Sequence, residues 1–319
     1  MPALKAEPSH LPVLLNETVE WLAPPADGIV LDATVGLGGH AAALLPRLPN
    51  GKYIGLDQDV DALQHAGRAL KDDPRVILRQ ANFADLLDVL TNLGNTKVDS
   101  VLMDIGVSSL QLDSPARGFS FQNPGPLDMR MDQSASLSAA DVVNTYSEEK
   151  LTQVIWEYGE DRKSRALARA IVNARAQKPF ETTEELAALA KRVNYQPAHK
   201  GAQKHPATRL FQAIRMEVNQ ELQVLEKGLK SALEVLKPGG RLAVISFHSL
   251  EDRIVKQFFK KESTDCVCPP EMPFCQCDHK ASIEVLTRKP VTATDSEMEQ
   301  NPRSRSAKLR VAEKLGKVS

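Results

Sequence analysis

Short apolar runs alternate with helical segments through the first third of the chain, and this pattern strongly limits the possible folds. Four runs have the length and composition of strands, and each of the first three is followed by a segment with helical spacing. Alternation of this kind builds right-handed β-α-β units with parallel neighbouring strands. The predicted strands are 28–34, 51–57, 75–79 and 98–104. The sequence therefore predicts an α/β domain with a doubly wound sheet.

The alternation is interrupted in the middle of the chain. Residues 111–140 are rich in Pro, Gly, Ser and Asp, which is typical of a long ordered loop, and 141–193 have helical periodicity. A chain of 319 residues is also long for one compact domain. We therefore predict an inserted helical domain, 111–207, within a discontinuous domain formed by 1–110 and 208–319.

The second half of the discontinuous domain opens with a long apolar repeat. Apolar residues recur every three or four positions over 208–236, which predicts one continuous amphipathic helix. Three later apolar runs predict further strands, at 241–247, 282–287 and 307–312.

Composition narrows the classes of protein. Hydrophobic residues make up 42% and charged residues 25%, which excludes a fully disordered or collagen-like chain. No apolar run approaches the roughly 18 residues that span a bilayer, and the N-terminal residues lack an apolar signal segment. We therefore expect a cytoplasmic protein with no membrane partner. The net charge is −1, so contacts with nucleic acid would have to come from local basic clusters.

A glycine loop joins the first predicted strand to the helix after it. Residues 31–41 read LDATVGLGGHA, and Asp57, at the end of the second strand, lies 19 residues beyond Gly38. Glycines let a backbone approach a ligand closely, the following helix offers free N–H groups, and an acid at this distance binds ribose hydroxyls. The combination predicts a nucleoside cofactor.

NAD and S-adenosylmethionine both fit such a loop. Asp32 precedes the glycines, where a carboxylate can meet an ammonium group, which S-adenosylmethionine has and NAD lacks. Phe83 follows the third strand and Asp104 ends the fourth, at the usual positions for the adenine and the methyl group. These features favour S-adenosylmethionine, although Phe83 also fits a core aromatic and Asp104 a loop cap.

Long motifs along the chain carry a family resemblance. They are DATVGLGGH at 32–40, DIGVSSLQLD at 104–113, RGFSF at 117–121, GPLDMRMD at 125–132, GEDRKSR at 159–165, HPATRLFQAIRMEV at 205–218, LAVISFHSLEDRIV at 242–255 and NPRSRSAKLR at 301–310. With these motifs the chain resembles the bacterial 16S ribosomal RNA cytosine N4-methyltransferase family from His10 to about Glu313. The resemblance implies a class I (Rossmann-like) methyltransferase fold with an inserted helical substrate-recognition domain. It also implies S-adenosylmethionine as cofactor and 16S ribosomal RNA of the small ribosomal subunit as partner.

The resemblance also assigns site residues. The family's cofactor contacts correspond to Gly38, Gly39, His40, Asp57, Phe83, Asp104 and Gln111. The exocyclic amine of cytosine is a poor nucleophile, so methyl transfer needs an acceptor that holds this amine in line with the methyl group. Asp104 is the candidate for that catalytic role, although it could serve the cofactor alone. Candidate contacts to the flipped cytosine are Ser108, Ser109, His248 and Ser249.

Basic residues are clustered in three runs. Residues 162–178 and 186–216 each hold six Lys or Arg and no acid, and 303–317 hold six with one Glu. Three such runs in a nearly neutral protein favour phosphate contacts over a merely solvated surface. We single out Lys200, Lys204 and Arg209, in the predicted insertion, as substrate contacts.

All four cysteines of the chain lie in one short segment. Cys266, Cys268, Cys275 and Cys277 offer four soft ligands within 12 residues, enough for a tetrahedral zinc site. Their spacing is tighter than in common zinc ribbons, so a metal-free thiol cluster remains the alternative, and the metal stays unknown at this point.

Two other functions compete with an RNA methyltransferase. A DNA amino-methyltransferase uses similar chemistry but would show Pro-Pro-aromatic after the fourth strand, where this chain has Asp104-Ile-Gly-Val. An RNA-binding assembly factor with a vestigial cofactor pocket is the other alternative, and the intact Asp32, glycine loop and Asp57 argue against it. The sequence leaves monomer and homodimer equally open.

Overall fold

The structure is a computed structural model that describes residues 11–71, 73–95, 97–194, 205–269, 271–272 and 274–316. The chain forms two compact units. One comprises Met1–Gly106 with Leu222–Ser319, and the other comprises Val107–Glu221. The helical unit thus begins slightly before residue 111 and extends beyond residue 207, the limits expected from the sequence.

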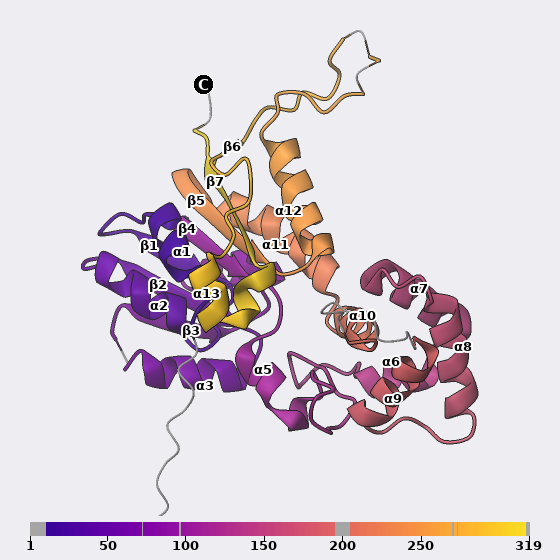
Figure 1. The fold of residues 1–319 in the computed structure, drawn as a ribbon. Coiled ribbons are helices and arrows are strands. Elements are labelled where there is room, and N and C mark those ends of the chain that lie inside the picture. Colours follow the sequence, from indigo (N-terminus) through magenta and orange to yellow (C-terminus); the bar gives the residue numbers. More distant parts are fainter. Residues whose placement is uncertain are drawn as a thin grey trace, which may run out of the picture. The chain divides into compact units, whose positions relative to one another are not determined.

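The first unit is built on a seven-stranded sheet with the order β3-β2-β1-β4-β5-β7-β6 (Figure 1). The strands are β1 Ile29–Asp32, β2 Lys52–Asp57, β3 Val76–Gln80, β4 Val98–Asp104, β5 Leu236–Ser246, β6 Ile283–Val285 and β7 Lys308–Lys314. β1 to β5 are parallel, whereas β7 is antiparallel to both β5 and β6. The strand order reverses between β1 and β4, and ligands bind α/β sheets at the carboxyl edge of such a switch point.

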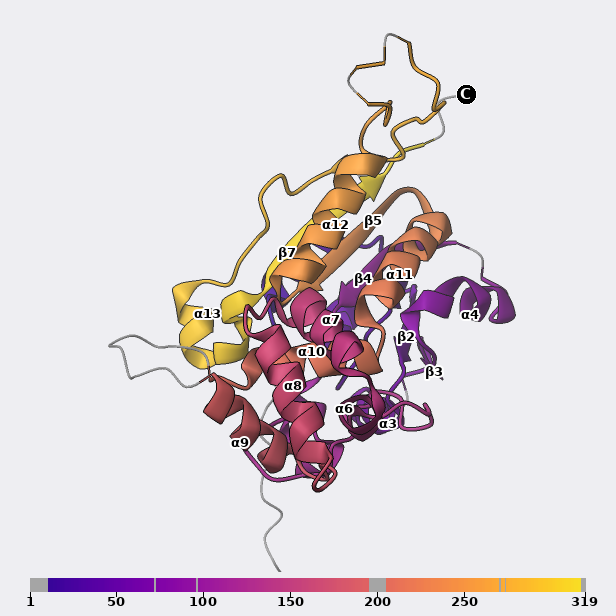
Figure 2. The same cartoon turned by 90° about the vertical axis from the view of Figure 1, so that its right-hand side faces the viewer.

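Helices cover both faces of this sheet (Figures 1 and 2). They are α1 Leu15–Leu22, α2 Gly39–Leu44, α3 Val60–Ala69, α4 Leu86–Asn92, α11 Glu221–Val235, α12 Ser249–Glu262 and α13 Asp295–Gln300, with 3-10 turns Leu45–Arg47, Phe83–Asp85 and Pro302–Ser306. Apolar side chains of α1, α2 and α3 share one core cluster with the strands, and those of α4, α11 and α12 share the other. The doubly wound arrangement predicted from the alternation is therefore present.

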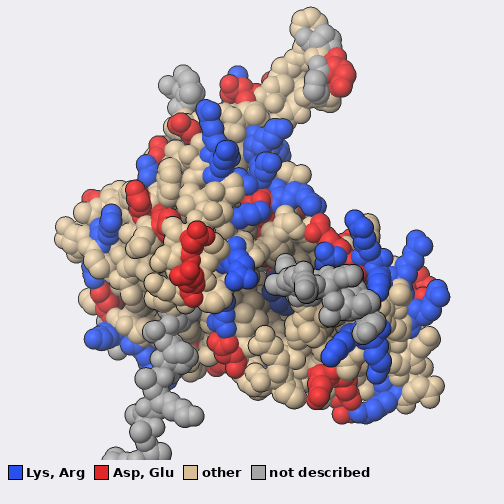
Figure 3. All heavy atoms as spheres, viewed as in Figure 1, with Lys and Arg blue, Asp and Glu red and all other residues tan. Residues whose placement is uncertain are grey.

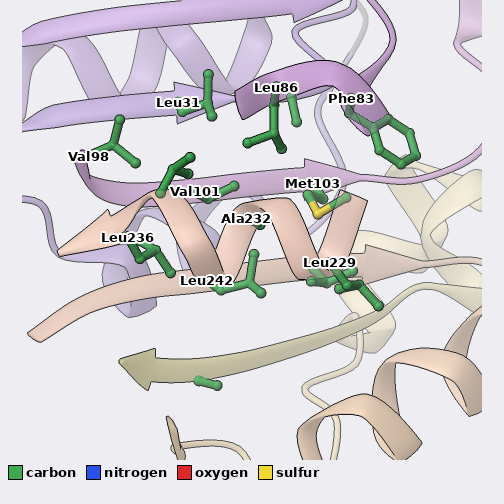
Figure 4. Close-up of a cluster of buried hydrophobic side chains, with 14 of the residues drawn as sticks. Leu31, Phe83, Leu86, Val98, Val101, Met103, Leu229, Ala232, Leu236 and Leu242 are labelled. Carbon is green, nitrogen blue, oxygen red and sulfur yellow. The ribbon is translucent and has the colours of Figure 1, made fainter. Parts of the chain in front are cut away.

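The strands are apolar on both faces because both faces are covered. In β1, Val30 belongs to the core cluster under α1 to α3 and Leu31 to the cluster under α4, α11 and α12. In β4, Leu102 belongs to the first cluster and Met103 to the second, as a side-chain period of two requires. Figure 4 shows Leu31, Met103 and their neighbours in the second cluster.

The second unit consists of helices around a separate apolar core. They are α5 Ser109–Asp113, α6 Ala139–Thr145, α7 Glu148–Gly159, α8 Ser164–Arg175, α9 Thr183–Val193 and α10 Thr208–Val218, with a 3-10 turn at Pro115–Arg117. Side-chain caps from Ser147 and Thr182 start α7 and α9. The segment expected as one loop, 111–140, also holds part of α5, a 3-10 turn and the start of α6.

The prediction of one continuous helix over 208–236 is wrong. α10 ends at Val218 and α11 starts at Glu221, because Gln220 has a φ of 49° and interrupts the helical hydrogen bonding. The Asn219 side chain is tied to the loop instead: its Oδ1 accepts from the N–H of Met131 at 2.8 Å and its Nδ2 donates to the carbonyl of Met129 at 2.8 Å. The apolar repeat continues across this break because each half packs into the core of a different unit.

Among the described residues, no helix combines the length and the apolar character that a membrane crossing requires.

Candidate active site

Three acidic residues end three adjacent parallel strands in the sheet unit. Asp32 ends β1, Asp57 ends β2 and Asp104 ends β4. The strand register pairs Asp32 with Gly55 of β2 and with Leu102 of β4, so the other two acids each lie two residues further along. All three therefore reach the carboxyl edge of the sheet at its switch point, where the sequence predicts the cofactor.

Asp32 is buried and hydrogen-bonded within the fold. The residue is 1% exposed, its Oδ2 accepts from the Tyr53 hydroxyl, at 2.5 Å, and its Oδ1 accepts from the N–H of Thr34 at 3.0 Å. Burial raises the pKa of Asp32 to about 6, against the lowering effect of these hydrogen bonds. Both oxygens of Asp32 already accept hydrogen bonds within the fold, and its expected contact with the ammonium group of a cofactor stays a prediction.

Asp57 holds the glycine loop. Its Oδ2 accepts from the N–H of Gly36 and its Oδ1 from the N–H of Asp59, each at 2.9 Å. Burial nevertheless raises the pKa of Asp57 to about 6. The loop needs glycine on its own account, since Gly36 and Gly38 have φ values of 53° and 84°. The hydrogen bond from Gly36 thus links the glycine loop to Asp57 at the end of β2.

The N-terminal segment packs against the same loop, which sequence reasoning missed. A Cβ added to Gly39 would lie 2.3 Å from Cγ of Pro12, so a close approach to Pro12 requires glycine there. His40 is 6% exposed, and its Nε2 lies 3.1 Å from the carbonyl oxygen of Val13. The run of prolines and polar residues at the N-terminus gave no periodic signal for these contacts.

Asp104 differs from the other two acids because one of its oxygens is buried without a hydrogen bond. Among the described residues, Oδ1 has no hydrogen-bond partner, and Oδ2 lies 3.9 Å from Nδ1 of His40. Burial, followed by the charges of Asp32 and Glu251, raises the pKa of Asp104 to about 8. A buried carboxyl group in this state is costly for the fold and is suited to a cationic or hydrogen-bond-donating ligand.

Phe83 packs mainly in the core. It is 9% exposed, and Figure 4 shows it at one end of the cluster that contains Met103 and Leu229. A Cβ on Gly228 of α11 would lie 2.5 Å from Cδ2 of the Phe83 ring, so this glycine is needed to seat the ring. The core alternative considered for Phe83 is therefore realised, and its contact with adenine stays a prediction.

His248 caps a helix. It is the N-cap residue of α12, where its Nδ1 accepts from the N–H of Glu251 at 3.4 Å and its Nε2 lies 2.9 Å from Oε1 of Glu251. Ser249 is the first residue of α12 and is exposed. The capping bond at Nδ1 gives His248 a structural role, while its predicted contact with cytosine stays untested.

Three predicted site residues belong to the helical unit. Ser108 and Gln111 form the capping box of α5, in which Ser108 Oγ accepts from the N–H of Gln111 at 3.2 Å and Gln111 Oε1 accepts from the N–H of Ser108 at 3.1 Å. Ser109 is the first residue of the helix and is 7% exposed. The capping box accounts locally for Ser108 and Gln111, and their cofactor and substrate roles stay predictions.

The predicted RNA contacts on the insertion fall into two groups. Lys200 and Lys204 lie outside the described residues. Arg209 is described, and its Nη1 donates to the carbonyl oxygen of Glu160 at 3.0 Å, where it closes the end of α7. Arg215, from the same basic run, forms a bidentate ion pair with Glu221, with N–O distances of 2.7 and 2.8 Å. Both arginines therefore have structural partners within the helical unit.

Other basic residues of the helical unit have no such partner in the part of the chain that the structure describes. The start of α8 lies beside the end of α9, because Lys163 Nζ donates to the carbonyl oxygen of Val193 at 3.0 Å. Four exposed cations here, none with an ion pair or hydrogen bond to the described residues, form the α8–α9 basic patch: Arg162, Arg165, Lys191 and Arg192. Figure 3 shows Lys and Arg side chains, in blue, gathered over the α7 and α8 side of this unit.

Comparison with known proteins identifies the family of the chain. The profile of the MraW methylase family matches residues 7–315. The "Ribosomal RNA small subunit methyltransferase H" of Carboxydothermus hydrogenoformans is 53% identical over 308 residues, which cover 96% of this chain and 98% of that protein. Proteins of the same name from Syntrophotalea carbinolica and Symbiobacterium thermophilum are 51% and 52% identical, each over 96% of this chain and over 98% and 96% of their own lengths. The chain belongs to the MraW methylase family.

Proposed function

We propose that this protein transfers a methyl group from S-adenosylmethionine to N4 of a cytidine in 16S ribosomal RNA of the small ribosomal subunit. Relatives about half identical over nearly the whole chain bear the name of a small-subunit ribosomal RNA methyltransferase. The observation that carries the chemistry is the Asp104 carboxyl group at the switch point, whose buried Oδ1 lacks a hydrogen bond among the described residues. The fold is accordingly that of an S-adenosylmethionine-dependent methyltransferase with a helical insertion.

The residues at the edge of β1, β2 and β4 suit this cofactor. S-adenosylmethionine supplies an electrophilic methyl group on a sulfonium, together with an ammonium group and a ribose diol. Asp57 ends β2 with a carboxylate that already orders the glycine loop, and in the proposed site it also accepts from the ribose hydroxyls. The raised pKa of Asp104 fits a carboxyl group whose ionised form is completed by a bound cation.

Methyl transfer to N4 of cytosine needs the amine nitrogen in line with the methyl–sulfur bond and a hydrogen-bond acceptor that holds the amine in that position. Oδ1 of Asp104 is an acceptor that the described part of the fold does not use. In the proposed reaction this carboxylate would accept an N–H of the amine and hold it in place. The N4 lone pair would form the bond to the methyl carbon as the carbon–sulfur bond breaks, S-adenosylhomocysteine would leave, and the amine proton would pass to the carboxylate. The target cytosine must leave its stacked position in the RNA to reach Asp104, because its N4 edge is otherwise paired or stacked against neighbouring bases.

The helical unit is proposed to bind the RNA backbone. Its support is the α8–α9 basic patch, whose four cations are exposed and unpaired among the described residues. A cation that already donates hydrogen bonds within the protein is less available to bind a phosphate. We therefore favour this patch over Arg209 as the phosphate contact.

The experiment measures transfer of a labelled methyl group from S-adenosylmethionine to small subunits, free 16S ribosomal RNA and duplex DNA, followed by mass spectrometry of the nucleosides. We expect label in small-subunit RNA as N4-methylcytidine. Asp104→Ala should remove this activity, whereas Glu226→Gln, which removes an exposed charge on α11, should keep it. Label in DNA would favour the DNA amino-methyltransferase, and RNA binding without any label would favour a vestigial site.

A further inference from the structure

The four cysteines lie together in a loop that the proposed methyl transfer does not use. The loop follows α12 and leads to β6, and its described residues contain no helix or strand (Figures 1 and 2). The sulfur atoms of Cys266, Cys268, Cys275 and Cys277 all lie within 4.8 Å of one another. Two Cys-x-Cys arms, separated by six residues in the sequence, thus face each other.

The sulfur spacing fits a tetrahedral metal site. Sγ of Cys277 lies 3.6 Å from Sγ of Cys275 and 3.8 Å from Sγ of Cys266. Four thiolates about 2.3 Å from a central zinc ion lie about 3.8 Å from one another, which is the edge of the tetrahedron. A disulfide would need about 2.05 Å between sulfurs, and all four cysteines are free.

Backbone groups support negative charge on these sulfurs. The N–H groups of Val267, Cys268 and Gln276 each point at a cysteine sulfur, at 3.4 Å. The sulfurs that accept these bonds are those of Cys277, Cys266 and Cys268. Hydrogen bonds of this kind stabilise thiolates, which are the form of cysteine that binds metal.

Few other contacts among the described residues hold the tip of the loop. Its base is closed by bonds between the backbones of Ser282 and Glu262, at 2.7 Å, and between His279 Nδ1 and the carbonyl oxygen of Thr264, at 2.9 Å. Beyond this base the large apolar side chains face solvent, with Phe274 79% exposed and Val267 42%. A loop without an apolar core of its own needs a cross-link such as a metal ion to keep one shape.

We propose that these four cysteines bind one zinc ion as a structural site. The four thiolates fill the tetrahedral coordination of zinc, so no position is left for water or substrate. The ion then joins the two arms of the loop and fixes the direction of the exposed tip. The site is independent of the three acids at the edge of β1, β2 and β4, and the proposal does not depend on the methyl-transfer reaction.

The test is metal analysis of the full-length protein, purified with reductant and without chelator from cells given zinc. We expect about one zinc per chain, and replacement by Co²⁺ should give the thiolate-to-metal charge-transfer and d–d bands of a tetrahedral four-sulfur site. The double variant Cys266→Ser with Cys277→Ser should lose at least about tenfold in zinc content, because two of four ligands are gone. His279→Gln is the matched control, since it removes a possible nitrogen ligand beside the cluster and should keep the metal.

Several results would overturn the proposal. They are zinc below about a tenth of an equivalent in the wild-type protein, iron in place of zinc, or two disulfides in the reduced preparation. Zinc that persists in the double variant, or that is lost in His279→Gln, would equally show that the four sulfurs are not the ligand set. The cobalt spectrum needs no variant, so the proposal stays testable even if the double variant folds poorly.

Discussion

Asp104→Asn is expected to make the fold more stable while it weakens the binding of S-adenosylmethionine. The substitution keeps the shape of the side chain and replaces a carboxyl group whose ionised form the fold disfavours and whose Oδ1 has no hydrogen bond among the described residues. A group of this kind costs the fold free energy and is retained only where function needs it. Stability and cofactor affinity should therefore change in opposite directions.

The size of the effect follows from the pKa of this carboxyl group. Burial raises the pKa of Asp104 from 3.8 to about 8, and each unit corresponds to about 1.4 kcal/mol. At pH 7, about three pH units above the unfolded pKa, this group is ionised in the unfolded chain and still protonated in the folded chain. The cost to the free energy of unfolding is therefore at most about 4 kcal/mol. The side chain is 24% exposed, so water relieves part of the cost, and we expect a gain of about 1–3 kcal/mol.

The sign of the pH dependence is fixed by the raised pKa. The protonated form of Asp104 is the one favoured by the fold, so the wild-type protein has no penalty at this residue below about pH 4. The penalty grows as pH rises from about 4 to about 8 and is constant above it. The stability difference between Asp104→Asn and wild type should follow the same curve.

Urea unfolding followed by tryptophan fluorescence can measure this difference in the sheet unit alone. The chain has two tryptophans, and Trp156→Phe removes the one in the helical unit and leaves Trp21 of α1. Asp57→Asn is the matched control, because the Asp57 oxygens accept two backbone N–H bonds and an amide can replace only one of them. We expect that control to be less stable than wild type. A destabilised Asp104→Asn, or an equal difference at pH 5 and pH 8, would refute the reasoning.

Three further outcomes are expected. Binding of S-adenosylmethionine at pH 7 should release a proton from Asp104, which calorimetry in buffers of different ionisation enthalpy would detect. The affinity for S-adenosylmethionine should also rise about tenfold from pH 7 to pH 9, and a pH-independent affinity would contradict this. Asp57→Ala should weaken cofactor binding by roughly 1.5–3 kcal/mol for each charged hydrogen bond removed, as titration of the folded variant would show. Neutralising the α8–α9 basic patch should raise the Michaelis constant for the RNA substrate and lower its log–log salt slope by roughly 0.7–0.9 for each phosphate that is no longer neutralised, with cofactor affinity within about twofold; loss of both affinities in a folded variant would contradict the division of roles.

The sheet was largely predictable because its strands are covered on both faces. β4 spans Val98–Asp104, the limits that its apolar run indicates, and β2 and β3 differ from their predicted limits by no more than one residue at each end. Such strands are short, continuous apolar runs between turns, and they leave a clear signal in the sequence.

The break between α10 and α11 was not predictable from periodicity. Phe211 and Ile214 pack in the core of the helical unit, whereas Leu225 and Leu229 pack in the core of the sheet unit, yet all four keep the same helical spacing. A positive φ at a residue such as Gln220 has no local signature, because any residue type can be forced into it by contacts further along the chain.

The glycine loop shows why a motif match identifies a fold sooner than a ligand. Gly36 and Gly38 are explained by their positive φ values, and Gly39 by its contact with Pro12, so each of these glycines has a reason that involves no cofactor. A stronger sign of a ligand site is a side chain that lowers the free energy of unfolding and has no compensating contact within the fold. Asp104 is such a side chain, since its carboxyl group lacks a described partner at one buried oxygen and has a pKa of about 8. This unrecovered cost is the reason for the proposal that a bound cation completes Asp104 in the cofactor site.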